Sequence, residues 1–187
     1  MKLSLKETEP QILQPSDSKE VHYGIKAEHL GILYEALGKN LYSDPIKAVV
    51  REYIANALDE HLDKKDLPIE IYLPTLTNPQ FEVVDYGRGM SPEFVQDYYV
   101  SYCSSDKNGL SLLKGEDNEN RKDLIGGYGF GSKTFAAYTN NFSFITIKDG
   151  VEYTYTSYIG KNSVPKCICH NKKEVDKVNS TRVIIPV

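Results

Sequence analysis

The chain has 187 residues with a formal net charge of −4, and 40% of the residues are hydrophobic and 26% charged. This length suits one domain with a single core, and the composition excludes a chain that is disordered throughout. The net charge offers no general attraction to nucleic acid or to an anionic membrane. No stretch approaches 18 apolar residues, and the start, MKLSLKETEP, lacks the apolar segment of a signal peptide. The odd number of cysteines argues against a disulfide framework, so we expect a cytoplasmic protein.

The first residues of the chain differ from the rest. Residues 1–22 are polar and contain two prolines, so we expect an N-terminal arm there and one domain over residues 23–187. Apolar residues at helical spacing and capping residues predict helices over 27–37, 44–62 and 91–100. In the second of these helices, Asp44 suits the N-cap and Pro45 suits the first helical position.

The remaining elements are mostly strands. Segments rich in β-branched and aromatic residues, bounded by turn residues, predict strands over 69–73, 81–84, 142–148, 151–158, 166–170 and 181–187. Asp149-Gly150 predicts a tight hairpin turn, and a further helix is expected over 132–138. Because helices and strands mix without βαβ alternation, the order predicts an α+β two-layer sandwich.

Three polar residues of the second predicted helix lie on one face. Glu52, Asn56 and Asp59 are spaced i, i+4 and i+7. A solvated face is the commoner explanation of such a stripe, but Asn is a poor residue inside a helix and here has apolar neighbours. An amide oxygen at Asn56 can ligate Mg²⁺, and a carboxylate at Glu52 can deprotonate an attacking water.

The strand that begins at Phe81 ends in Asp-Tyr-Gly-Arg-Gly-Met, residues 85–90. Glycine is needed where the backbone turns sharply or approaches a ligand closely. Asp85 at the strand end can accept a hydrogen bond from an exocyclic amine such as that of adenine. An ordinary β-turn is the alternative explanation, because Asp and Gly are common in turns.

A polar run and a glycine-rich loop follow. Residues 104–123 are polar, so we expect either disorder or a functional lid over roughly residues 101–125. The loop after them fits Gly-x-x-Gly-x-Gly, with its glycines at 126, 129 and 131, and it fits neither a Walker A nor a Rossmann pattern. Such a loop before a helix presents backbone N–H groups to phosphate, and Lys133 adds a charge. A flexible hinge without a ligand is the alternative.

The order and spacing of these motifs resemble the GHKL ATPases, the superfamily of gyrase, Hsp90, histidine kinases and MutL. Glu-x-x-x-Asn-Ala-x-Asp, Asp-x-Gly-x-Gly-Met, a polar lid and Gly-x-x-Gly-x-Gly follow one another over roughly residues 30–187. Ser180-Thr181 is similar to the last box of the family, although many relatives have Gly in place of Ser180. The resemblance implies a Bergerat-type fold, with a mixed sheet covered on one face by helices, and ATP or ADP with Mg²⁺ as ligands.

The resemblance also implies a role for each motif residue. Glu52 is the implied general base, Asn56 the implied Mg²⁺ ligand, and Asp59 and Gly87 support the nucleotide site. The implied adenine-binding residues are Asp85, Thr181, Gly89 and Met90. The implied phosphate-binding residues are Lys107, Gly126, Gly129, Gly131, Ser132 and Lys133.

A narrower likeness is to the rIIA-like proteins of tailed phages. It rests on residues 40–44, 48–53, 56–61 and 129–133, with Tyr138 shortly after. It implies a viral protein in the host cytoplasm that acts on lysis control or host exclusion, with another phage or host protein as a possible partner. Because such proteins usually continue beyond their ATPase domain, we expect the chain to be part of a longer protein.

The leading functional hypothesis is slow, Mg²⁺-dependent ATP hydrolysis that closes the lid and promotes a homodimer. The alternative is a nucleotide-sensing scaffold that does not hydrolyse ATP. A histidine kinase is disfavoured, because no helical segment with an acceptor His precedes the ATP-binding motifs. ATP-gated DNA binding receives no support from the net charge.

Overall fold

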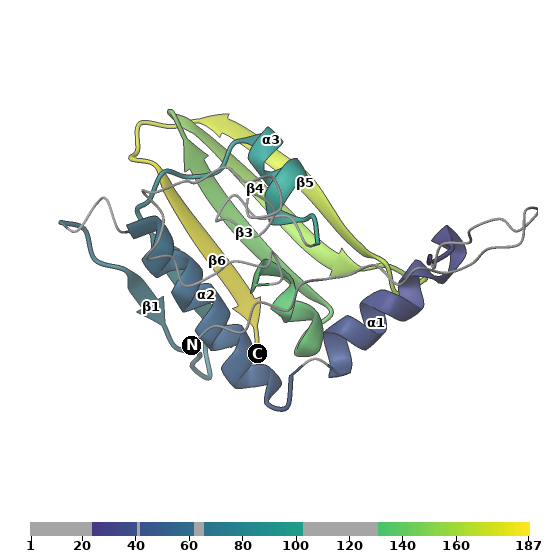
Figure 1. Ribbon diagram of the computed structural model, residues 1–187. Coiled ribbons are helices and arrows are strands. Elements are labelled where there is room, and N and C mark those ends of the chain that lie inside the picture. The colour runs from purple at the N-terminus through teal and green to yellow at the C-terminus, as the bar shows by residue number, and fades with distance from the viewer. Residues whose placement is uncertain (1–23, 41, 62–65, 103–130) are drawn as a thin grey trace, which may run out of the picture.

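The structure is a computed structural model, and it describes residues 24–40, 42–61, 66–102 and 131–187 (Figure 1). The predicted arm, nearly all of the predicted lid, and the predicted phosphate-binding residues Lys107, Gly126 and Gly129 lie outside these residues. The described residues form helices and one sheet, which confirms the predicted mixture of the two without βαβ alternation.

The sheet has six strands in the order β1-β2-β6-β3-β4-β5. They are β1 (Glu70–Tyr72), β2 (Gln80–Asp85), β3 (Asn141–Lys148), β4 (Val151–Ile159), β5 (Pro165–Glu174) and β6 (Ser180–Pro186). A mixed sheet was expected, whereas each pairing of these strands is antiparallel. The reason is topological: short connections join β1 to β2, β3 to β4 and β4 to β5, and β6 returns between β2 and β3.

The helices begin and end close to the predicted positions. They are η1 (Ala27–His29), α1 (Leu30–Asn40), α2 (Pro45–His61), α3 (Pro92–Phe94), η2 (Val95–Tyr99) and η4 (Gly131–Ala137). The predicted cap of α2 is confirmed, since Asp44 Oδ1 accepts a hydrogen bond from the Lys47 amide at 3.1 Å. The helix predicted over 91–100 is one α-helical turn followed by a π-helical turn, η2, and the helix predicted over 132–138 is the 3₁₀ helix η4. No helix of the described residues is long and apolar enough to cross a membrane.

An aromatic core joins the helices to one face of the sheet. Phe142 of β3 lies 4.6 Å from Phe135 of η4 and 5.7 Å from Tyr53 of α2, measured between ring centroids. Phe144 lies opposite Tyr155, with ring centroids 4.8 Å apart, across the hairpin that the sequence predicted. Figure 1 shows α2 and η4 side by side over the sheet. The core therefore holds α2 in a fixed orientation, which decides where its polar residues point.

Candidate functional site

Three strands place a row of polar side chains next to the aromatic core. Asp85 ends β2 and lies opposite Thr181 of β6, which in turn lies opposite Thr146 of β3. Directly opposite residues of antiparallel strands share a face, so the three side chains lie side by side. Their exposed fractions are 7%, 8% and 0%. These three residues are thus buried polar side chains beside an apolar core. Burying a polar group is costly unless it is hydrogen-bonded, so we expect hydrogen bonds within this row.

The glycines of the loop after Asp85 are required by close contacts. The Gly87 amide donates to Asp85 Oδ1 at 3.0 Å, which orients the carboxylate. A Cβ on Gly87 would lie 2.7 Å from Glu60 Cβ of α2, so a side chain there would push the loop away from the helix. Gly89 has a φ of +66°, and a Cβ there would collide with the Ile147 carbonyl oxygen. The predicted need for glycine at both positions is therefore confirmed.

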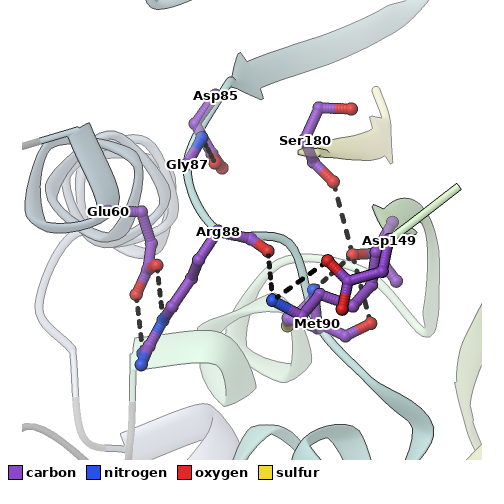
Figure 2. Close-up of polar contacts among 9 residues, drawn as sticks. Glu60, Asp85, Gly87, Arg88, Met90, Asp149 and Ser180 are labelled. Carbon is purple, nitrogen blue, oxygen red and sulfur yellow. Dashed lines mark hydrogen bonds and ion pairs between the residues drawn. The ribbon is translucent and has the colours of Figure 1, made fainter. Parts of the chain in front are cut away.

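Thr146 holds the end of this loop and was not identified from the sequence. The Met90 amide donates to Thr146 Oγ1 at 2.7 Å, and the Ser180 carbonyl oxygen lies 3.3 Å from the same hydroxyl (Figure 2). Met90 itself is buried. The sequence did offer a signal for Thr146. It follows Phe142 and Phe144 at every second position of β3, so it is a polar residue on the face of the strand that points to the core.

Arg88 connects the loop to two helices, and sequence reasoning also missed it. Its Nε and Nη2 donate to the two carboxylate oxygens of Glu60 at 2.8 and 3.0 Å (Figure 2). The guanidinium carbon lies 5.1 Å from the centre of the Phe94 ring. The Arg88 carbonyl oxygen accepts from Lys148 Nζ at 3.1 Å. No local pattern reveals the Arg88–Glu60 pair, because the two residues are 28 positions apart.

The stripe on α2 meets the glycine-rich loop at Gly131. A Cβ on Gly131 would lie 3.1 Å from Glu52 Oε2 and 3.3 Å from Asn56 Nδ2. Glu52 and Asn56 therefore point to the same place, as their spacing predicted, and the backbone of Gly131 passes directly beside both. Asp59, the third residue of the stripe, is buried further along the helix.

The carboxylate of Glu52 has different neighbours on its two oxygens. Arg51 Nη2 donates to Glu52 Oε1 at 2.7 Å, and Oε2 faces Gly131. The Arg51 side chain is exposed, whereas that of Glu52 is mostly buried. Burial, together with the negative charge of Glu52, raises the pKa of the Tyr42 hydroxyl. The predicted base is thus a partly buried carboxylate with one oxygen engaged by an exposed arginine.

Ser132 and Lys133 tie η4 to the end of η2. Ser132 Oγ donates to the Tyr99 carbonyl oxygen at 2.7 Å. Lys133 is only 7% exposed, and its Nζ donates to the Tyr98 carbonyl oxygen at 3.2 Å. The structure therefore places both predicted phosphate-binding side chains on backbone carbonyls of η2. To bind a phosphate, the Lys133 ammonium would share its N–H donors between this carbonyl and the phosphate or turn away from the carbonyl.

Comparison with known proteins agrees with this arrangement. A family model described as "Histidine kinase-, DNA gyrase B-, and HSP90-like ATPase" matches residues 42–183. No curated protein sequence matches the chain. Among solved structures, the ATPase region of Saccharomyces cerevisiae topoisomerase II bound to ICRF-187 (dexrazoxane) aligns with a TM-score of 0.56 at 19% identity. The alignment covers 75% of this chain and 38% of that one, and at this identity it shows a shared fold.

Proposed function

The chain belongs to the family of histidine kinase-, DNA gyrase B- and HSP90-like ATPases, and we propose that it binds Mg²⁺–ATP and hydrolyses it slowly with Glu52 as the general base. The observation that carries the proposal is the position of α2 between two parts of one site. Glu60, near its C-terminal end, touches the loop after Asp85, and Glu52 and Asn56 meet the glycine-rich loop at Gly131. Eight residues of helix span about 12 Å, which suits an elongated ligand with a base at one end and phosphates at the other.

We propose that Asp85 recognises the adenine base. The Gly87 amide orients the Asp85 carboxylate, which then accepts a hydrogen bond from the exocyclic amine of the base. Thr181 lies directly beside Asp85 in the sheet, where it would support this contact, and we assign Gly89 and Met90 to adenine binding as well. The low exposure of the row excludes water, which strengthens a hydrogen bond to a charged group.

The residues around Gly131 fit a magnesium triphosphate. The Asn56 amide oxygen is a hard donor of the kind Mg²⁺ prefers, and the bound ion would neutralise phosphate charge. Glu52 Oε2 faces the same point, where it would orient and deprotonate the attacking water. We assign phosphate binding to the amides of Gly126, Gly129 and Gly131, with Ser132, Lys107 and Lys133 beside them, and structural support to Asp59 and Gly87.

A nucleotide-sensing scaffold is the second candidate function. It is favoured by the contacts that already occupy two of the side chains assigned to hydrolysis. Arg51 engages one oxygen of Glu52, and Lys133 is bound to the Tyr98 carbonyl. Either contact lowers turnover unless nucleotide binding releases it. Slow hydrolysis and pure sensing therefore differ in whether these contacts break in the ATP-bound state.

We further propose that ATP binding closes a lid over roughly residues 101–125 and promotes a homodimer in which residues 1–22 pack on the partner protomer. The proposed setting is a phage rIIA-like protein in the host cytoplasm, acting on lysis control or host exclusion. The phage setting rests on the similarity of residues 40–44, 48–53, 56–61 and 129–133 to that group, and lid closure and dimerisation rest on the resemblance to the superfamily. Light scattering with a saturating non-hydrolysable ATP analogue tests it, and a strictly monomeric chain would exclude the dimer.

Thermal unfolding with ADP or a non-hydrolysable ATP analogue, with and without Mg²⁺, tests the nucleotide site. Ligand at about a hundred times Kd stabilises a protein by roughly 2.7 kcal/mol, which raises Tm by about 5–10 °C for a chain of this size. We expect such a shift in the wild type, enlarged by Mg²⁺, and its loss in Asp85→Asn. Asp149→Asn, in the β3–β4 turn, is the matched control and keeps the shift. No shift in the wild type at millimolar nucleotide would refute the proposed function.

A further inference from the structure

The Arg88–Glu60 ion pair lies at the junction of three elements. Arg88 belongs to the loop after β2, Glu60 to α2, and Phe94, whose ring faces the guanidinium, to α3. Both nitrogen–oxygen contacts are of hydrogen-bond length, at 2.8 and 3.0 Å. A bidentate arginine–carboxylate pair defines an orientation as well as a distance, which a single contact does not.

Arg88 is held at its backbone as well as at its side chain. Lys148 Nζ donates to the Arg88 carbonyl oxygen at 3.1 Å, so the residue is fastened to β3 on one side and to α2 on the other (Figure 2). The neighbouring Gly87 has no room for a Cβ against Glu60. The loop therefore contacts α2 closely at Gly87 and is bound to α2 through the ion pair of Arg88.

This geometry links the two parts of the proposed site. The loop orients Asp85 through the Gly87 amide, and α2 carries Glu52 and Asn56. We propose that Arg88 and Glu60 are positioning residues, which hold the adenine-binding loop at a fixed distance from the helix that carries the general base. The ATP-related part of this inference rests on the proposed function, whereas the ordering of the loop does not.

Arg88→Met and Glu60→Gln test the pair, because both keep most of the side-chain volume while removing the charge pairing. The first measurement is hydrogen–deuterium exchange of the Gly87 and Met90 amides without nucleotide. We expect exchange at least tenfold faster in Arg88→Met and a smaller increase in Glu60→Gln, since local opening becomes easier. The charge-swapped double variant Glu60→Arg/Arg88→Glu should recover most of the protection.

Lys173→Met is the matched control. It removes an ion pair away from the loop, Lys173 Nζ to Glu152 Oε1 at 2.9 Å, while Lys177 Nζ stays 3.8 Å from Glu152 Oε2. Loop exchange should stay at the wild-type rate in this variant. If Arg88→Met and Glu60→Gln leave loop exchange unchanged, or speed exchange equally throughout the chain, the positioning role is wrong.

Steady-state kinetics then separates positioning from general destabilisation. We expect the KM for ATP to rise about tenfold in Arg88→Met, with kcat within about twofold of the wild type. A fall in kcat at unchanged KM would overturn the assignment to the adenine-binding loop. If the wild type binds no nucleotide, the proposed function fails, and the exchange measurement still decides whether the pair positions the loop.

Discussion

The two ends of the candidate site are built differently. At the Asp85 end, buried side chains from three paired strands and a loop with backbone hydrogen bonds define the geometry. At the Gly131 end, the polar groups come from helices, and the contacts are made by long side chains. Arg51 donates to Glu52, and Lys133 donates to the Tyr98 carbonyl oxygen. Strand register cannot change without refolding the sheet, whereas a lysine or arginine changes partner by rotating its side chain.

On the proposed function, the two ends have different roles, recognition of the base at the Asp85 end and hydrolysis at the Gly131 end. A preformed, buried end suits binding of a rigid base, because little entropy is lost on ordering it. At the Gly131 end, the long side chains can change their hydrogen-bond partners. This suits a step such as hydrolysis, which occurs only after the nucleotide has bound. Variants at the Asp85 end should therefore change the free protein and its affinity, and variants at the Gly131 end should mainly change turnover.

The largest expected effect is at Glu52. Glu52→Gln should lower kcat for ATP about 10²- to 10⁴-fold, since a general base contributes about that much, while the nucleotide-induced rise in Tm persists. Single-turnover hydrolysis and thermal unfolding of the same sample measure both. Glu93→Gln, at an exposed position of α3, is the control and should retain activity. Turnover that is unchanged in Glu52→Gln would remove Glu52 from the mechanism.

Lys133 provides the sharpest test of exchangeable partners. Lys133→Met should reduce kcat/KM about tenfold, because a charge-assisted contact to phosphate is lost. The ligand-free Tm should change little, because methionine fills the buried volume and Tyr98 is 40% exposed, so water can replace the Lys133 ammonium at its carbonyl oxygen. A large fall in the ligand-free Tm with normal kinetics would show that Lys133 is structural, and the contrast between the two ends would fail.

Thr146 tests the preformed end. Thr146→Val keeps the shape but removes the acceptor of the buried Met90 amide, so the free protein should lose about 1–3 kcal/mol of stability. Nucleotide affinity should fall with it, because the loop is less ordered. Urea unfolding and titration calorimetry measure the two effects. Thr154→Val on β4 is the control, and equal losses in both variants would argue against a special role for Thr146.

The smallest expected effect is at the cap of α2. The hydrogen bond from the Lys47 amide, helped by the Lys47 side chain, lowers the pKa of Asp44, so its stabilisation exists above the unfolded-state pKa and is lost as pH falls through the folded-state pKa. Asp44→Ala should therefore lower Tm slightly at pH 7, and the difference should shrink as pH falls through the folded-state pKa of Asp44. Thermal unfolding of both proteins over an acid pH series checks it. A difference that stays the same size at every pH would mean that the carboxylate charge is not its source.

The sequence by itself determined the local features of this protein. Caps, helical spacing and strand alternation depend on residues a few positions apart, so α2, the hairpin of β3 and β4, and the shared face of Glu52 and Asn56 followed from it. The need for glycine at position 89 is equally local, because a positive φ is a property of one residue.

Only the tertiary structure decided which distant residues meet. The return of β6 between β2 and β3 makes the sheet antiparallel and sets Thr181 and Thr146 beside Asp85. Packing of α2 on the sheet brings Glu60 to Arg88, and packing of η4 on α2 brings Lys133 to the Tyr98 carbonyl. Such contacts depend on how whole layers fit together around the core, and no pattern within one segment encodes that fit.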